Sequence, residues 1–148
     1  MKSLTNVPAL EEKDYGPNCS EEELHALKSW VYLYNNDVMI LKPAPKTNAF
    51  VVRVFDEQMR EISTNLKSFD LILDLTSKHE RPSAEIRDYI RQQLISFGKV
   101  RRVKAVTGAN WLANIAAQFI FNSHGLPSLT VHKTLEQALE ALESDVRT

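Results

Sequence analysis

Cysteine is nearly absent from this chain, and other markers of particular protein classes are missing with it. Cys19 is the only cysteine among 148 residues, so an internal disulfide and a cysteine-rich metal site are both excluded. The four histidines include no pair spaced four residues apart. A helical zinc-binding motif is therefore absent, and we expect neither a metal site nor a cofactor.

Long apolar runs and a strong net charge are also missing. No stretch approaches the roughly 20 consecutive apolar residues of a membrane span, and residues 1–10 lack the apolar core of a signal peptide. The formal net charge of −1 gives no general electrostatic reason to expect nucleic acid or a membrane surface as a partner. With 43% hydrophobic and 25% charged residues, the composition is typical of a soluble, single-domain, cytoplasmic protein.

Basic residues gather in one region of the sequence. They are Arg87, Arg91, Lys99, Arg101, Arg102 and Lys104. A nucleic-acid surface normally adds interleaved aromatic residues or a wider excess of positive charge. We therefore interpret this group as a solvent-exposed helix face and strand entry, and expect no nucleic-acid partner.

The chain is organised around Phe69–Thr76, a short apolar run that ends in an acid and a hydroxyl. This pattern predicts a strand buried on both faces of a sheet, as in parallel sheets. Helical patterns flank it at Asn48–Leu66 and Ser83–Phe97. The segment Thr47–Leu66 also contains a strand-like run, Phe50–Phe55, but its apolar residues continue at helical spacing for five turns, so we predict a helix.

The other elements fit an alternating α/β pattern. A capping box at Ser20 and Glu23 starts a short helix within an N-terminal extension, residues 1–28. The expected elements after it are a hairpin of Trp30–Tyr34 and Val38–Leu41, strands within Val100–Thr107 and Leu129–Val131, and helices over Asn110–Ser123 and from Thr134 to about Leu142. The prediction is an α/β fold whose mixed sheet has an N-terminal antiparallel hairpin, parallel central strands and a covering of helices.

Polar residues follow the predicted parallel strands at their carboxyl ends, where α/β proteins bind ligands. The candidates for an anion-binding edge are Thr76, Ser77, Lys78, Thr107, Gly108 and Asn110. Caps and turns use the same residue types, so a purely structural role remains the alternative. Nearby, His79 and Glu80 have no spacing of a hydrolase and no nucleophile elbow. We expect no catalytic residues and no enzymatic activity.

The stretch from Ala105 to His132 contains no Asp, Glu, Lys or Arg. On its predicted helix, amides recur every four residues, and apolar residues occupy more of the circumference than one sheet can cover. A second copy, another protein, a lipid-like ligand or the N-terminal extension could cover the remainder. The residues that we predict to bind a partner are Trp111, Asn114, Ile115, Gln118 and Phe121.

Several short motifs carry a resemblance to a known family. They are Asn48-Ala49, Leu73-Asp74-Leu75-Thr76, Val106-Thr107-Gly108 and Thr134-Leu135-Glu136-Gln137-Ala138-Leu139. Through them, the chain from about Trp30 to Leu142 resembles the STAS domains, and among these the divergent SpoIIAA-like (STAS/Sec14-like) proteins of bacteria. The resemblance implies a STAS-like domain over residues 29–148.

The resemblance implies a non-enzymatic regulatory module that binds another protein or a second copy of itself in the bacterial cytoplasm. Its Sec14-like part implies an alternative, a carrier or sensor of a small apolar or anionic ligand. The family's Asp-Ser-Ser-Gly phosphorylation motif is replaced by Pro82-Ser83-Ala84-Glu85. Ser83 is therefore only a weak phosphosite candidate, and we do not expect an obligatory phospho-switch there.

Overall fold

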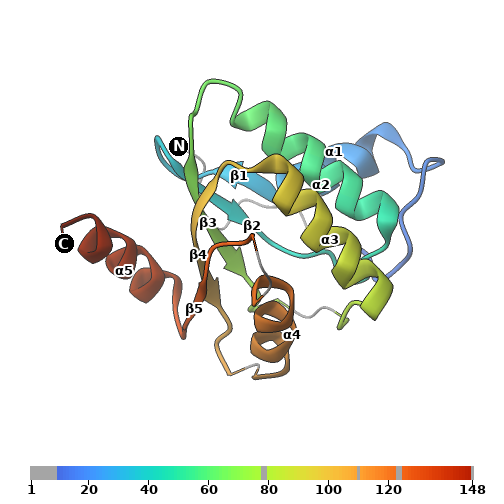
Figure 1. Ribbon diagram of the computed structural model, residues 1–148. Helices are drawn as coiled ribbons and strands as arrows, with labels where there is room; N and C mark the ends of the chain where they lie inside the picture. Colours follow the sequence, from blue (N-terminus) through green and yellow to red (C-terminus); the bar gives the residue numbers. More distant parts are fainter. Residues whose placement is uncertain (1–9, 78–79, 110, 123–124, 148) are drawn as a thin grey trace.

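The computed structural model describes residues 10–77, 80–109, 111–122 and 125–147. These residues form the expected α/β fold (Figure 1). Its elements are α1 (Glu21–Ser29), β1 (Val31–Leu33), β2 (Val38–Leu41), α2 (Ala49–Ile62), β3 (Phe69–Asp74), α3 (Ala84–Phe97), β4 (Val100–Val106), α4 (Trp111–Phe121), β5 (Leu129–His132) and α5 (Leu135–Arg147). The segment Thr47–Leu66, which also has a strand-like run, contains helix α2, as predicted.

The five strands form one mixed sheet in the order β1-β2-β3-β4-β5. The hairpin strands β1 and β2 are antiparallel, whereas β2 to β5 run parallel to one another. Leu71 of β3 lies beside Val103 of β4, which confirms the predicted adjacent parallel strands. Every residue of β3 from Phe69 to Leu73 is buried, as expected for a strand covered on both faces.

Alternating side chains of the sheet enter two hydrophobic clusters. Leu71 and Leu73 of β3 belong to the cluster shared with α2 and α4, whereas Ile72 packs with Ala138 and Leu142 of α5. In Figure 1, α1 to α4 lie on one side of the sheet and α5 lies on the other. The parallel strands follow one another in chain order, so their connecting helices α2, α3 and α4 share one face.

The described part of the N-terminal extension is joined to this domain. Tyr15 and Leu27 are buried in the larger cluster. Asn48 caps α2 by accepting a hydrogen bond from the Val51 N–H at 2.9 Å, and its amide donates to the Tyr15 carbonyl at 2.9 Å. Helix α1 packs against α2 and β1. Residues 10–30 thus cover the α2 end of the sheet, whereas α4 lies at the other end in Figure 1.

The interpretation of the basic group as solvent-exposed was wrong for part of β4. Lys104 is only 6% exposed, and Arg102 donates hydrogen bonds to Asp70, which is 2% exposed. Strand alternation places Lys104 beside Ile72 on the face that α5 covers. A register irregularity between Phe69 and Asp70 accompanies the approach of Arg101 to the same carboxylate.

Candidate functional site

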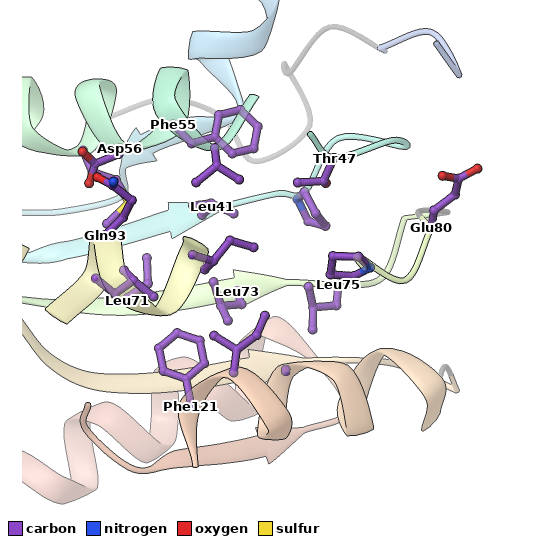
Figure 2. Close-up of a pocket in the computed structure, with 18 residues that line it drawn as sticks. Leu41, Thr47, Phe55, Asp56, Leu71, Leu73, Leu75, Glu80, Gln93 and Phe121 are labelled. Carbon is purple, nitrogen blue, oxygen red and sulfur yellow. The ribbon is translucent and has the colours of Figure 1, made fainter. Parts of the chain in front are cut away.

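An apolar cavity of about 140 Å³ lies between the sheet and helices α2, α3 and α4 (Figure 2). Its floor consists of leucines from β2, from β3 and from the residue just after β3. They are Leu41, Leu71, Leu73 and Leu75. An engineered apolar cavity of similar size, about 150 Å³, stays dry and binds benzene. The volume is therefore sufficient for a small apolar molecule.

The three helices line the cavity unequally. Helix α2 contributes the buried side chains of Phe55 and Met59. Helix α4 contributes Ile120 and Phe121, but also Ala117, whose methyl group leaves space that a larger residue would fill. Every described side chain of α3 is at least partly exposed. The apolar stripe of α3 packs against the larger cluster only partly buried, and Ile90 and Leu94 of this stripe line the cavity.

The polar lining lies at the two ends of the cavity. Figure 2 shows Asp56 and Gln93 at one end and Thr47 and Glu80 at the other. The Asp56 carboxylate accepts a hydrogen bond from the Nε of Arg60 at 2.8 Å. At the opposite end the Glu80 carboxylate points away from the cavity. We call these the Asp56–Gln93 end and the Thr47–Glu80 end.

The loops at the Thr47–Glu80 end are connected to each other. The Glu80 N–H donates to the Pro45 carbonyl at 2.8 Å, which joins the loop after β3 to the loop before α2. Pro43 and Pro82 line the cavity from these two loops. This end is therefore built from chain segments that the prolines and the backbone hydrogen bond restrain.

The structure brings together the described residues of the predicted anion-binding edge. A Cβ atom added to Gly108 would lie 3.8 Å from the Thr76 methyl group. However, the N–H of Thr76 bonds to the Asp74 carboxylate, and those of Thr107 and Gly108 bond to the carbonyls of His132 and Lys133. These three N–H groups are already used within the chain. Ser77 follows Thr76 in the loop, and Lys78 and Asn110 lie outside the described residues.

The edge also lacks the crevice that α/β proteins use most often. That crevice forms where the order of parallel strands reverses and successive helices move to opposite faces. Here the order is sequential throughout, so no such point arises among the four parallel strands of the described sheet. The geometry favours caps and turns at this edge, and anion binding there stays a prediction.

The residues predicted to bind a partner are divided between the surface and the core. Ile115 is 42% exposed and Gln118 is also exposed, whereas Phe121 is 3% exposed and lines the cavity. Asn114 is partly buried, and its side-chain oxygen has no hydrogen-bond partner among the described residues. The Trp111 side chain lies outside what the structure describes. In this conformation only Ile115 and Gln118 offer a contact surface from the described members of the set.

Ser83, the weak phosphosite candidate, is the N-cap of α3. Its hydroxyl accepts a hydrogen bond from the Ile86 N–H at 3.2 Å, and the side chain is exposed. In the parts of the chain that the structure covers, no group of three or more His, Cys, Asp or Glu side chains is placed to hold a metal ion. None of the described helices combines the length and apolar character needed to cross a membrane.

Comparison of the chain with family models, curated proteins and solved structures gave no match. The functional assignment therefore depends on the geometry of this molecule. The sequence does not reveal the cavity, because periodicity shows which face of a helix is apolar but not whether the facing elements fill the space between them. The signal that was available is Ala117, a small residue on the inward face of α4.

Proposed function

We propose that this chain binds a small, largely apolar molecule in the cavity beneath α3, as a carrier or a sensor. The observation that supports this function best is an apolar space roofed by a helix without one fully buried side chain. The Sec14-like alternative of the sequence resemblance implies the same class of function. We do not propose a catalytic step.

Filling the cavity would be favourable for simple physical reasons. Side chains that line an empty space lose the dispersion contacts that close packing supplies. Each methylene group moved from water into an apolar site contributes about 0.8 kcal/mol. A short alkyl chain or a single ring can therefore bind measurably without an ion pair.

Hexanol is a suitable probe, because it is neutral and contains as many carbon atoms as benzene. We expect saturable changes in the methyl NMR signals of Leu73 and Ile120 when hexanol is titrated into the protein. An Ala117→Leu variant fills part of the cavity, so it should bind hexanol at least about tenfold more weakly, a loss of about 1.4 kcal/mol. Ala141→Leu on α5, across the sheet, is the matched control.

Absence of saturable shifts in the wild-type protein would contradict ligand binding in this cavity. Equal binding by the wild type and Ala117→Leu would place the ligand elsewhere. Circular dichroism of each variant shows whether it is folded. Native mass spectrometry of protein purified from cells then tests whether the protein retains a bound molecule.

A second candidate is the STAS-like regulatory module, which would bind a protein partner or a second copy in the bacterial cytoplasm. The observation that favours it is the pair of large exposed apolar side chains, Ile95 on α3 at 44% and Ile115 on α4 at 42%. Helices α3 and α4 pack side by side. Association through this surface can be tested separately from ligand binding.

A further inference from the structure

The chemistry of the cavity ends indicates which ligands it accepts. We propose, given the apolar cavity function above, that the ligand is a neutral or cationic amphiphile and that an anionic one is rejected. Its apolar part would occupy the space over Leu71, Leu73 and Leu75, and its polar group would donate a hydrogen bond at the Asp56–Gln93 end. This narrows the ligand class, which the sequence left open between apolar and anionic.

The charges that line the cavity carry this inference. Both of its charged lining residues are acids, Asp56 and Glu80, one at each end. Among the residues that the structure describes, no lysine, arginine or histidine lines it. A carboxylate or phosphate group on the ligand would therefore approach the like charge of Asp56 at the Asp56–Gln93 end, whereas the exposed Glu80 carboxylate points away from the cavity at the other end. Water screens such repulsion only partly at a half-buried site.

Arg60 pairs with Asp56 at the Asp56–Gln93 end, and its guanidinium also contacts Phe97 and Ser96. Its Nε donates to one carboxylate oxygen of Asp56, and its guanidinium lies over the ring of Phe97 at 4.6 Å from the centroid. An Nη atom also approaches the Ser96 hydroxyl at 3.4 Å. Arg60 thus offsets part of the Asp56 charge but leaves the second carboxylate oxygen as an acceptor.

Gln93 supplies a second polar group at the same end. Its side chain lines the cavity and is partly buried. No hydrogen bond to its amide is found within the described part of the chain. A hydroxyl or ammonium group between Asp56 and Gln93 would meet a carboxylate oxygen and an amide oxygen, both acceptors. A carboxylate there could accept only from the amide N–H₂ and would still face Asp56.

The test compares three ligands that share one alkyl chain. Hexanol, hexylamine and hexanoate are titrated into the wild-type protein at pH 7, where the amine is protonated and the acid is ionised. We expect hexanol and hexylamine to bind, and hexanoate to bind at least about tenfold more weakly than hexanol. Hexanoate binding as tightly as hexanol would overturn this inference and leave the proposed function intact. Failure of all three to bind would contradict the proposed function itself.

Variants locate the source of the discrimination. Asp56→Asn should weaken hexylamine and strengthen hexanoate, reducing the difference between them at least about threefold. Glu57→Gln removes a negative charge from the next, exposed position of α2 and should leave the order of the ligands unchanged. Gln93→Leu, with exposed Gln92→Leu as its control, should weaken hexanol. Full discrimination in Asp56→Asn would show that this carboxylate is not responsible and would overturn its assigned role.

Discussion

Asp70 is a buried carboxylate at the beginning of the central strand. Burial acts to raise its pKa, but hydrogen bonds from Arg102 and Arg101 outweigh that effect, and the pKa lies below its ordinary value. Arg101 also bonds to Asp37 in the hairpin turn at 2.8 Å. The cluster therefore ties the hairpin to β3 and β4. The sequence showed these acids and bases but not their pairing, because register determines which side chains meet.

Replacing Asp70 by Asn should destabilise the fold. Two guanidinium groups would lose the charge of a buried carboxylate. Their own side chains are 39% and 24% exposed, so the cost should lie below the value of about 3–5 kcal/mol for a fully buried pair. Urea denaturation at pH 7 measures the free energy of unfolding. The control is Asp88→Asn on the exposed face of α3, where the ion pair with Arg91 contributes about 0–1 kcal/mol.

The pH dependence of the Asp70 variant gives a second readout. A carboxyl group with a lowered pKa stabilises the fold above its ordinary pKa of 3.8 and loses that contribution as the pH falls through the folded-state value. The stability of Asp70→Asn should therefore decline less steeply than that of the wild type as the pH falls below about 4. Parallel curves would contradict the assigned ion pairs.

Tyr32 should make the fold sensitive to alkali. It is 3% exposed, and burial together with the charge of Asp74 raises its pKa to about 12 from 10. The neutral Tyr32 side chain makes its full contribution to the unfolding free energy below pH 10. That contribution is lost as the pH rises toward 12, by up to about 1.4 kcal/mol per pH unit. Tyr32→Phe should show a shallower decline in unfolding free energy over that range. Tyr89→Phe, a partly exposed position, is the control; equal slopes for Tyr32→Phe and the wild type would contradict the prediction.

At the scale of elements, the sequence predicted the type and order of every helix and strand in the described chain. The apolar run of β3 and the helical spacing within α2 were sufficient, because each pattern reflects one strong burial requirement. Boundaries were less certain: Trp30, expected in a strand, is the C-cap of α1. The sequence could not predict which helices cover each face of the sheet, nor the presence of the cavity, since both depend on how separate elements pack together.

Helix α3 should be less stable than its neighbour α2. Helix α2 buries five side chains, whereas α3 buries none. Helices with few buried apolar contacts open locally at lower free energy. Hydrogen exchange should therefore be faster for backbone amides of α3, such as that of Ile90, than for those of Phe55 and Met59 in α2. Hexanol should slow exchange in α3 more than in α5, because a ligand stabilises the structure that binds it. Equal protection of α2 and α3 without ligand would contradict this prediction.

At the scale of the whole molecule, the two candidate functions use opposite sides of the same helices. The inward sides of α3 and α4 line the cavity through Ile90, Leu94 and Ile120, while Ile95 and Ile115 are exposed. The uncharged stretch from Ala105 to His132 identified α4 as unusual but did not separate these roles. Burial separates them, because Phe121 lies in the core and Ile115 does not.

Substitutions on the two sides of α4 should therefore differ in their effects. Phe121→Ser removes a buried aromatic ring and should cost about 3–5 kcal/mol of unfolding free energy. Ile115→Lys changes an exposed side chain, so its effect on the unfolding free energy should stay within about 0.5 kcal/mol.

If α4 contributes to an interface, Ile115→Lys should weaken self-association, measured by sedimentation velocity over a concentration series, because charge is depleted from interface cores. Gln92→Lys on the exposed side of α3 is the matched control. A monomeric wild type would exclude the second copy, and the same pair of variants would then be compared for capture of a protein partner. Unchanged association of Ile115→Lys with whichever partner the wild type binds would show that Ile115 does not contribute to the interface.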